Sequence, residues 1–320
     1  MGEAPAGRPA ANRPDAPAHP ADAAVPVIPP DPADLEDLSD LESLSDLADL
    51  VDLCRGKRLA ALTGAGLSTG SGLPDYRGTG SSGMPTVDID LFLSDPMWRR
   101  WVWQRNQETW RALQTLPPTR GHLALAQLEA AGMLEGVATQ NVDGLHQRAG
   151  SRRVAELHGS FMLVDCLGCG HQFPRDWLDA RLREANPWLV DDPDPAHVAI
   201  LAGVDPEGAR ASRLTLVDCP DCGGLLKPDV VFFGESLPQA ALSDAFAMAD
   251  SCDVLLVVGT SVKVSTAVWV AGQAASSGAA LVVINRGPTD LDHDPGVTLR
   301  IEGDCGVYLP ALAHALGATA

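Results

Sequence analysis

The chain has 320 residues, of which 45% are hydrophobic, and this is enough to bury the core of one or two domains. Its formal net charge of −19 makes a surface that repels nucleic acid phosphates and anionic membranes but tolerates basic, lysine-rich protein partners. Because no apolar run reaches the length of a membrane span and no secretion signal opens the chain, we expect a cytoplasmic protein that binds neither nucleic acid nor membrane.

The first segment is an acidic tail. Residues 1–33 are rich in Pro and Ala without a periodic apolar pattern, so we expect them to be disordered. Leucine then recurs every three residues from Leu35 to Leu53. A helix turns about 100° per residue, so this period drifts by about 60° per repeat and would spread the leucines around one long helix. We expect only residues 44–55 to pack as a helix, and the tail at 1–43 either to solubilise the chain or to bind a partner.

From Arg58 onward, strand-sized apolar runs alternate with helical patterns. The expected strands are 59–63, 136–140, 254–259, 280–285 and 297–301, and the expected helices include 121–132 and 238–250. This alternation is typical of a parallel sheet covered on both faces. We therefore expect an α/β parallel-sheet domain made of residues 44–77, 121–152 and 228–320. A second composition, with all the paired cysteines, indicates a smaller inserted domain made of residues 78–120 and 153–227.

The strand at 59–63 runs into the glycine-rich turn Gly64-Ala65-Gly66. Glycines there let the backbone approach a pyrophosphate, and a following helix would offer N–H groups and the positive end of its dipole. The spacing G-x-G-x-x-x-G departs from the standard dinucleotide fingerprint, so a plain strand-to-helix turn is the alternative. The segment PDYR at 74–77 follows in a Gly/Ser-rich loop, which suggests a lid that orders on a cofactor.

The paired cysteines predict a metal site. Cys166 and Cys169 form one Cys-x-x-Cys pair, Cys219 and Cys222 form another, and each pair is followed by glycine. Four thiolates make a closed tetrahedral Zn²⁺ site that is structural and has no open position. Two disulfides are the alternative, which a cytoplasmic setting disfavours. We expect one structural zinc ion per chain, which does not need the nearby His158 as a ligand.

Polar residues follow several expected strands, and ligands bind beyond the carboxyl ends of strands in an open α/β sheet. Gln140, Asn141 and Asp143 would hold an amide and ribose hydroxyls there, or Asn141 and Asp143 would only cap a helix. His158 ends the strand-like run VAELH, although an isolated histidine is more often structural than catalytic. Two later strands also end in small or polar residues that would converge on the same crevice, Gly259-Thr260-Ser261 and Asn285-Arg286.

Together these residues resemble the sirtuin family of NAD-dependent protein deacylases. The matching motifs occur in order over roughly residues 45–315, and they are GAGLSTGSGLPDYRG, TQNVDGLH, ELHGS, the two Cys-x-x-Cys pairs, LKPDVVFFGE, GTSVKV and INRGPT. The resemblance is closest to the class II branch, which includes a mitochondrial member in animals. It implies a Rossmann-like domain with an inserted small zinc-binding and helical domain, and a cleft between them where NAD and acyl-lysine meet.

The resemblance also implies a role for each matching residue. His158 matches the catalytic base, since a neutral imidazole is suited to take a proton from a ribose hydroxyl. Asn141 and Asp143 match catalytic positions that orient the nicotinamide amide and its ribose. The NAD-binding residues would be Gly64, Ala65, Gly66, Asp75, Tyr76, Arg77, Gln140, Asn141, Asp143, Gly259, Thr260, Ser261, Asn285 and Cys305. The residues that hold the acyl-lysine peptide would be Val231, Phe233, Gly234 and Glu235.

The implied reaction removes acyl groups from protein lysine and gives nicotinamide, O-acyl-ADP-ribose and free lysine. The branch of the family that removes acidic acyl groups carries a Tyr and an Arg three residues apart, where this chain has Val102 and Arg105. We expect Arg105 either to meet an acyl carboxylate in the substrate site or to form a surface salt bridge. Val102 in place of Tyr leaves the acyl preference open.

Two other functions compete with deacylation. Transfer of ADP-ribose to protein and removal of lipoyl-type amides would use the same pocket. A zinc-ribbon binding module without catalysis, such as a nucleic acid binder, is the non-enzyme alternative. The net charge of −19 and the intact Asn141, Asp143 and His158 argue against that module. We expect a monomer whose partners are acyl-lysine proteins.

Overall fold

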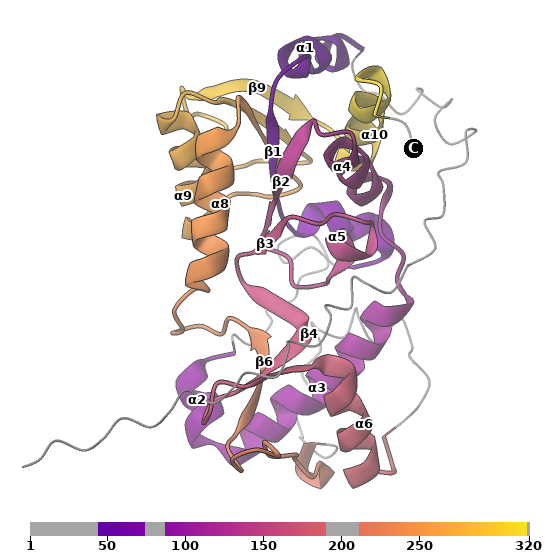
Figure 1. Ribbon diagram of the computed structural model, residues 1–320, viewed down its shortest axis with the longest axis vertical. Helices are drawn as coiled ribbons and strands as arrows, with labels where there is room; N and C mark the ends of the chain where they lie inside the picture. Colours follow the sequence, from indigo (N-terminus) through magenta and orange to yellow (C-terminus); the bar gives the residue numbers. More distant parts are fainter. Residues whose placement is uncertain (1–43, 74–86, 190–210, 319–320) are drawn as a thin grey trace, which may run out of the picture.

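The computed structural model of the chain describes residues 44–73, 87–189 and 211–318 (Figure 1). The expectations for the tail at 1–43 and for Asp75, Tyr76 and Arg77 lie outside the described residues. The helix expected at 44–55 is confirmed as α1 (Leu44–Cys54). Among the helices of the described residues, none combines the length and the apolar character that crossing a bilayer requires.

A six-stranded parallel sheet forms the centre of the larger part of the molecule. Its strand order is β3-β2-β1-β7-β8-β9. The bounds are β1 (Leu59–Thr63), β2 (Leu134–Thr139), β3 (Val154–Glu156), β7 (Val254–Val258), β8 (Ala280–Asn285) and β9 (Val297–Glu302). The five expected strands are confirmed, and β3 lies inside the strand-like run VAELH. The chain moves outward from β1 in one direction and then from β7 in the other, so the order reverses between these two strands, as in Rossmann-like sheets.

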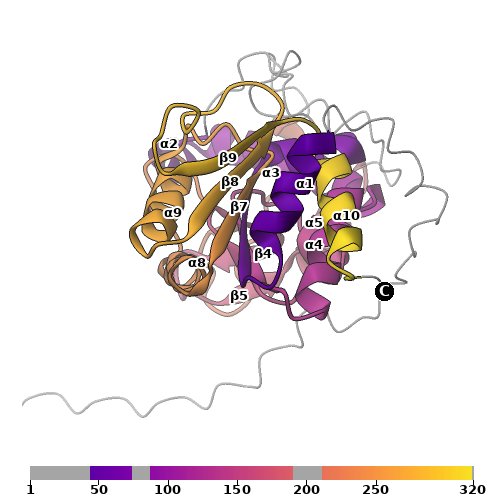
Figure 2. The same ribbon diagram turned by 90° about the horizontal axis from the view of Figure 1, so that it is seen from above.

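Helices cover both faces of this sheet, as Figure 2 shows. On one face lie α1, α4 (Arg120–Ala130) and α10 (Cys305–Ala315), and on the other lie α8 (Gln239–Ser251) and α9 (Ser265–Ser276). The central strand β7 divides its side chains between the two layers. Val254, Leu256 and Val258 belong to the buried cluster with α1, α4 and α10. Leu255 and Val257 belong to the cluster with α8 and α9. Burial on both faces explains why this strand is apolar at every position.

The smaller part of the molecule is built on a three-stranded antiparallel sheet, drawn below the large sheet in Figure 1. Its strands are β4 (Gly159–Cys166), β5 (Gln172–Pro174) and β6 (Leu226–Val230), in the order β5-β4-β6. The helices packed with it are α2 (Ile89–Ser94), α3 (Pro96–Thr115), α6 (Arg175–Ala185) and the short η6 (Ala211–Arg213). Phe92, Trp101, Trp103 and Val164 form part of one buried cluster there.

Two strands fall on the other side of the expected domain boundaries. The sequence expectation assigned β3 to the small part, but β3 pairs with β2 in the large sheet. It also assigned most of β6 to the large part, but β6 pairs with β4 in the small sheet. The physical reason is that both strands lack a clear apolar run. β3 has only three residues, and β6, with the sequence LKPDV, includes a lysine, a proline and an aspartate.

Candidate functional site

The glycine-rich turn lies where the strand order reverses. The Gly66 N–H donates to Gly259 O at 2.8 Å, which joins the segments that follow β1 and β7. A Cβ atom on Gly64 would lie 2.7 Å from Thr260 Cβ, and one on Gly66 would lie 2.8 Å from Gly259 O. These glycines are therefore required by the close approach of the two strand ends. The α-helix expected after the turn is instead a 3₁₀ helix, η4 (Ala65–Ser71), because its glycine, serine and threonine residues are poor helix formers.

Asn141 and Asp143 are buried, and both form hydrogen bonds with Ser68, which follows the glycine-rich turn. Asn141 Nδ2 donates to Gly64 O at 3.0 Å and to Ser68 Oγ at 3.1 Å. Ser68 Oγ donates to Asp143 Oδ2 at 2.7 Å. Asp143 Oδ1 also accepts the Leu145 N–H at the start of α5 (Leu145–Arg148), although the N-cap of this helix is Gly144. Burial raises the pKa of Asp143. Ser68 was not predicted as a site residue from the sequence, although it stands inside the GAGLS motif.

His158 lies between β3 and β4 with both ring nitrogens in hydrogen bonds. Nδ1 is 3.0 Å from Gln140 O, and Nε2 is 3.1 Å from Thr266 Oγ1. A carbonyl oxygen only accepts, so Nδ1 carries the proton and Nε2 carries the lone pair. Burial lowers the pKa of His158, which favours the neutral ring at neutral pH. The site therefore holds an imidazole in the form that a general base needs.

The backbone at His158 is fixed by the small sheet. The Val231 N–H donates to His158 O at 2.9 Å. The next residue, Gly159, has φ +76°, and a Cβ there would collide with Asp229 O. Glycine is thus required at 159 both by the positive φ and by the close approach of β6.

A series of buried hydrogen bonds connects His146 to the backbone of Asn141, and it was not predicted from the sequence. His146 Nε2 is 2.9 Å from Thr63 Oγ1, and Thr63 Oγ1 donates to Thr139 Oγ1 at 2.9 Å. The Asn141 N–H donates to Thr139 Oγ1 at 3.1 Å. His146 is fully buried, which lowers its pKa to about 3, and its ring packs edge-on against His122 at 4.7 Å between centroids. These hydrogen bonds between His146, Thr63 and Thr139 fix the backbone from which the Asn141 side chain projects.

The other residues expected to bind NAD surround the same strand ends. Gln140 Nε2 donates to Thr260 Oγ1 at 2.9 Å. Asn285 Nδ2 donates to the carbonyl oxygens of the two residues that follow it, which closes the turn after β8. Cys305 begins α10 with its Sγ 3.8 Å from Gly66 O, and burial raises the pKa of this thiol to about 12, so it is neutral. The structure thus brings the described members of this group to one edge of the sheet, where a dinucleotide fits a Rossmann-like fold.

The segment expected to hold the peptide follows β6. Phe233 is 65% exposed, and its backbone exchanges hydrogen bonds with Val87 and Ile89. Glu235 Oε2 pairs with the buried Lys227 Nζ at 3.1 Å and accepts the Phe232 N–H, so its side chain stabilises the turn. Phe233 and Gly234 are therefore the exposed residues of this segment, whereas Val231 is half-buried.

Two residues expected near the acyl group lie on α3. The Arg105 guanidinium stacks over the Trp101 ring at 5.0 Å from its centroid. Val102 is buried in the core of the small part of the molecule. A role for Arg105 in binding an acyl carboxylate stays a prediction.

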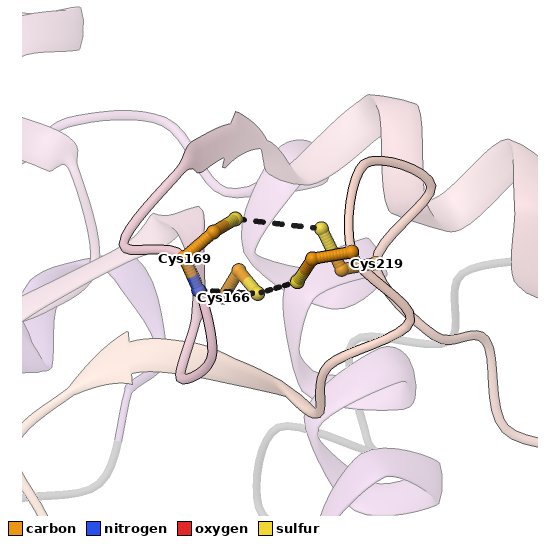
Figure 3. A group of neighbouring side chains, drawn as sticks. Cys166, Cys169 and Cys219 are labelled. Atoms are coloured by element: carbon orange, nitrogen blue, oxygen red, sulfur yellow. Dashed lines mark hydrogen bonds between the residues drawn. The ribbon is translucent and has the colours of Figure 1, made fainter. Parts of the chain in front are cut away.

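The four paired cysteines come together at the end of the small sheet where Cys166 pairs with Leu226. Figure 3 shows Cys166, Cys169 and Cys219 of this group. Their Sγ atoms all lie within 4.8 Å of one another. The Gly168 N–H donates to Cys166 Sγ at 3.3 Å, and the Gly224 N–H donates to Cys222 Sγ at 3.3 Å. Four converging sulfurs that also accept backbone N–H groups fit a tetrahedral Zn²⁺ ion, as the sequence predicted.

A comparison with known proteins gives one consistent family. A family model described as the Sir2 family matches residues 64–266. NAD-dependent protein deacetylase 1 of Mycobacterium avium (strain 104) is 42% identical over 262 residues, which cover 82% of this chain and 92% of that protein. NAD-dependent protein deacetylase of Xanthomonas axonopodis pv. citri (strain 306) is 39% identical over 264 residues, which cover 82% and 88%.

Solved structures agree with these relatives. One described as "Sir2-p53 peptide-NAD+" superposes with a TM-score of 0.65 at 32% identity, covering 84% of this chain and 97% of that one. Another, "Sir2 bound to acetylated peptide", superposes with a TM-score of 0.66 at 29% identity, covering 85% and 99%.

Proposed function

This chain belongs to the Sir2 family, and from that premise we propose that His158 is the general base of an NAD-dependent removal of acyl groups from protein lysine. The activity follows from the family, because relatives that are 39% and 42% identical are NAD-dependent protein deacetylases. The chain is accordingly an NAD-dependent protein-lysine deacylase that carries a structural zinc site. The class II assignment is part of our proposal.

The protonation state of the His158 ring is the observation that supports its role as the general base. Its Nδ1–H donates to Gln140 O, which leaves the lone pair on Nε2 to accept a proton. The lowered pKa of the buried ring keeps Nε2 unprotonated at neutral pH. The zinc site has four thiol ligands of its own, so the imidazole is free for chemistry.

Asn141 and Asp143 orient the nicotinamide end of NAD in this proposal. NAD supplies a glycosidic bond whose cleavage activates the ribose carbon toward the acyl oxygen. Asn141 is held by Gly64 and Ser68, and Asp143 is held by Ser68 and Leu145. Side chains fixed in this way lose little freedom when they bind a ligand. The loop with Asp75, Tyr76 and Arg77 completes the site in our proposal.

The acyl-lysine enters beside Phe233 and Val231 in this proposal. Val231 is joined to His158 by a backbone hydrogen bond, so a peptide on this segment would lie beside the base. The net charge of −19 favours lysine-rich protein substrates over nucleic acids or anionic membranes. We also propose a monomer in the cytoplasm, with one NAD-binding domain and one small zinc-binding domain.

The test is a His158→Ala variant with NAD and a panel of acyl-lysine peptides. We expect O-acyl-ADP-ribose to disappear while zinc content and the melting temperature stay at the parent values. His314→Ala is the matched control, because His314 is exposed in the last turn of α10. The mass of the products separates deacylation from ADP-ribosyl transfer and from lipoamide cleavage. Parent-like turnover, or loss of zinc, in the His158 variant would contradict the assignment.

A further inference from the structure

The first two turns of α9 expose an apolar surface. Val264, Val268 and Trp269 are 37%, 43% and 49% exposed. Val264 is the N-cap residue of the helix, and residues four apart lie on one helix face, so Val264 and Val268 are neighbours and Trp269 adjoins them. Farther along α9 the exposed side chains are small or polar, among them Gly272 and Ser276. The apolar surface is therefore confined to the end of α9 that follows β7.

This surface takes no part in the packing of α9 on the large sheet. The helix packs through Ala267, Val270 and Ala271, which belong to the buried cluster with the central strands. Val268 and Trp269 are outside that cluster. Tryptophan is the residue most enriched at the centres of protein interfaces, and contiguous exposed apolar side chains are typical of binding surfaces.

The apolar end of α9 adjoins the proposed base. Thr266 Oγ1 is 3.1 Å from His158 Nε2, and Trp269 follows Thr266 within one helical turn. The backbone of His158 is bonded to Val231, two residues before the exposed Phe233. His158 thus contacts both the segment proposed to hold the peptide and the helix with the apolar surface. A peptide whose acyl-lysine reaches His158 has its neighbouring residues within reach of α9.

A lysine without an ion pair stands at the same end of α9. Lys263 is exposed and directly precedes Val264, and among the residues that the structure describes it has no acidic partner. The loop before it is fixed, because Val262 is fully buried with φ +56° and its N–H donates to Thr260 Oγ1 at 3.2 Å. In a chain with a net charge of −19, this ammonium group is a local site that attracts an acidic side chain.

We propose that Lys263, Val264, Val268 and Trp269, together the α9 surface, select the residues next to the acyl-lysine in the substrate. The occupant is a segment of the substrate protein with one large apolar and one acidic side chain within about 13 Å of the acyl-lysine, which is about four residues of extended chain. The apolar side chain packs on Trp269 and the two valines, and the carboxylate pairs with Lys263. This inference rests on the proposed function, because the acyl-lysine bound beside His158 is what brings the segment to α9.

The first experiment compares acyl-lysine peptides that differ only in their flanking residues. One peptide has Gly and Ser flanks, and the others have Leu at successive positions on either side of the acyl-lysine. We expect the best Leu peptide to have a KM about three- to tenfold below that of the Gly/Ser peptide, from partial burial of one apolar side chain. Trp269→Ser should remove most of this preference, and Trp269→Phe should keep it. Leu44→Ser is the matched control, because Leu44 is 67% exposed on α1, which precedes β1 at the opposite edge of the sheet.

The second experiment reverses the charge of Lys263. With Leu kept at its best position, a flanking Glu should give a kcat/KM about two- to fivefold above that of a flanking Lys at low salt. Lys263→Glu should reverse this order. Lys57→Glu is the matched control, because Lys57 is exposed between α1 and β1. Each result is a ratio of two peptides for one variant, so a general loss of folding or activity cancels.

Every outcome decides the inference. Equal KM values for the Leu and Gly/Ser peptides would overturn it, as would a full Leu preference in Trp269→Ser or an unchanged charge preference in Lys263→Glu. A parent dimer that dissociates in Trp269→Ser, seen by sedimentation, would also overturn it, because a second copy would then be the occupant. If His158→Ala turns over like the parent, the proposed function fails. If His158→Ala is inactive and the parent does not distinguish the flanking residues, only this inference fails.

Discussion

Replacing Gly159 with alanine should move the base without touching any group that reacts. Gly159 follows His158 directly and has φ +76°, and a Cβ there would collide with Asp229 O. The left-handed backbone costs a non-glycine residue about 1–2 kcal/mol. Relief of the collision requires a shift of β4 against β6, which costs a further 1–3 kcal/mol or so. We expect Gly159→Ala to lose about 2–5 kcal/mol of stability in total.

Gly132 supplies the matched control for this variant. It has φ +72°, but nothing lies within 4 Å of the position that its Cβ would take. Gly132→Ala should therefore lose only the backbone part, about 1–2 kcal/mol, and keep the parent turnover at temperatures where it is folded. Gly159→Ala should also lose turnover, because the shift of β4 breaks the Val231 to His158 backbone bond.

Urea unfolding followed by fluorescence gives the two stabilities, and peptide deacylation gives the two rates. Equal loss of stability in both variants would refute the role of the Asp229 contact. Normal turnover in Gly159→Ala, measured where it is fully folded, would refute the link between this contact and the base.

Three further predictions follow from the same geometry. Cys219→Ser should release zinc and lower the melting temperature, since metal binding supplies folding free energy, and metal analysis with thermal unfolding checks this. The pKa of His146 is lowered to about 3 in the folded protein, so below pH 6.5 only the unfolded chain binds a proton at this histidine. The parent therefore loses about 1.4 kcal/mol of stability per pH unit below pH 6.5, and His146→Gln does not. The difference in unfolding free energy between the two proteins should narrow from pH 6.5 to 5, and a constant difference in urea titrations would contradict this. Arg105→Met should raise KM for acidic acyl peptides more than for neutral ones, and equal changes in peptide kinetics would assign Arg105 a structural role through its stacking on Trp101.

The elements that the sequence predicted well are those with a strong local pattern. Strand β7 is apolar at every position because it is buried on both faces, and the expected helix α1 buries Leu50, Val51 and Cys54. The four cysteines carry their ligand geometry in their spacing. In contrast, β3 and β6 have no apolar run, and they were assigned to the wrong sheets.

The missed site residues are those that act only through distant partners. Thr63 and His146 are 83 positions apart, and Thr266 is 108 positions from His158. A threonine near a helix start and a histidine on a short helix have no local signature that indicates such pairings. Ser68 stands in the glycine-rich motif, so a site role for it could have been predicted. Its hydrogen bond to Asp143, however, forms only because β1 and β2 are adjacent in the sheet.

The small sheet connects the zinc site to the base, although zinc takes no part in the reaction. Strands β4 and β6 pair Cys166 with Leu226 at one end and Gly159 with Val230 at the other. The metal ligands therefore stand at one end of this strand pair, and His158 precedes it at the other end, roughly 26 Å away along an extended strand. The His158 ring is held by the large sheet through Gln140 and Thr266, while its backbone is held by β6. Loss of a zinc ligand should loosen the pairing of β4 with β6 and so displace the His158 backbone, while its ring stays bound to Gln140 and Thr266. We therefore expect the turnover of Cys219→Ser to fall at temperatures below those at which the large sheet unfolds.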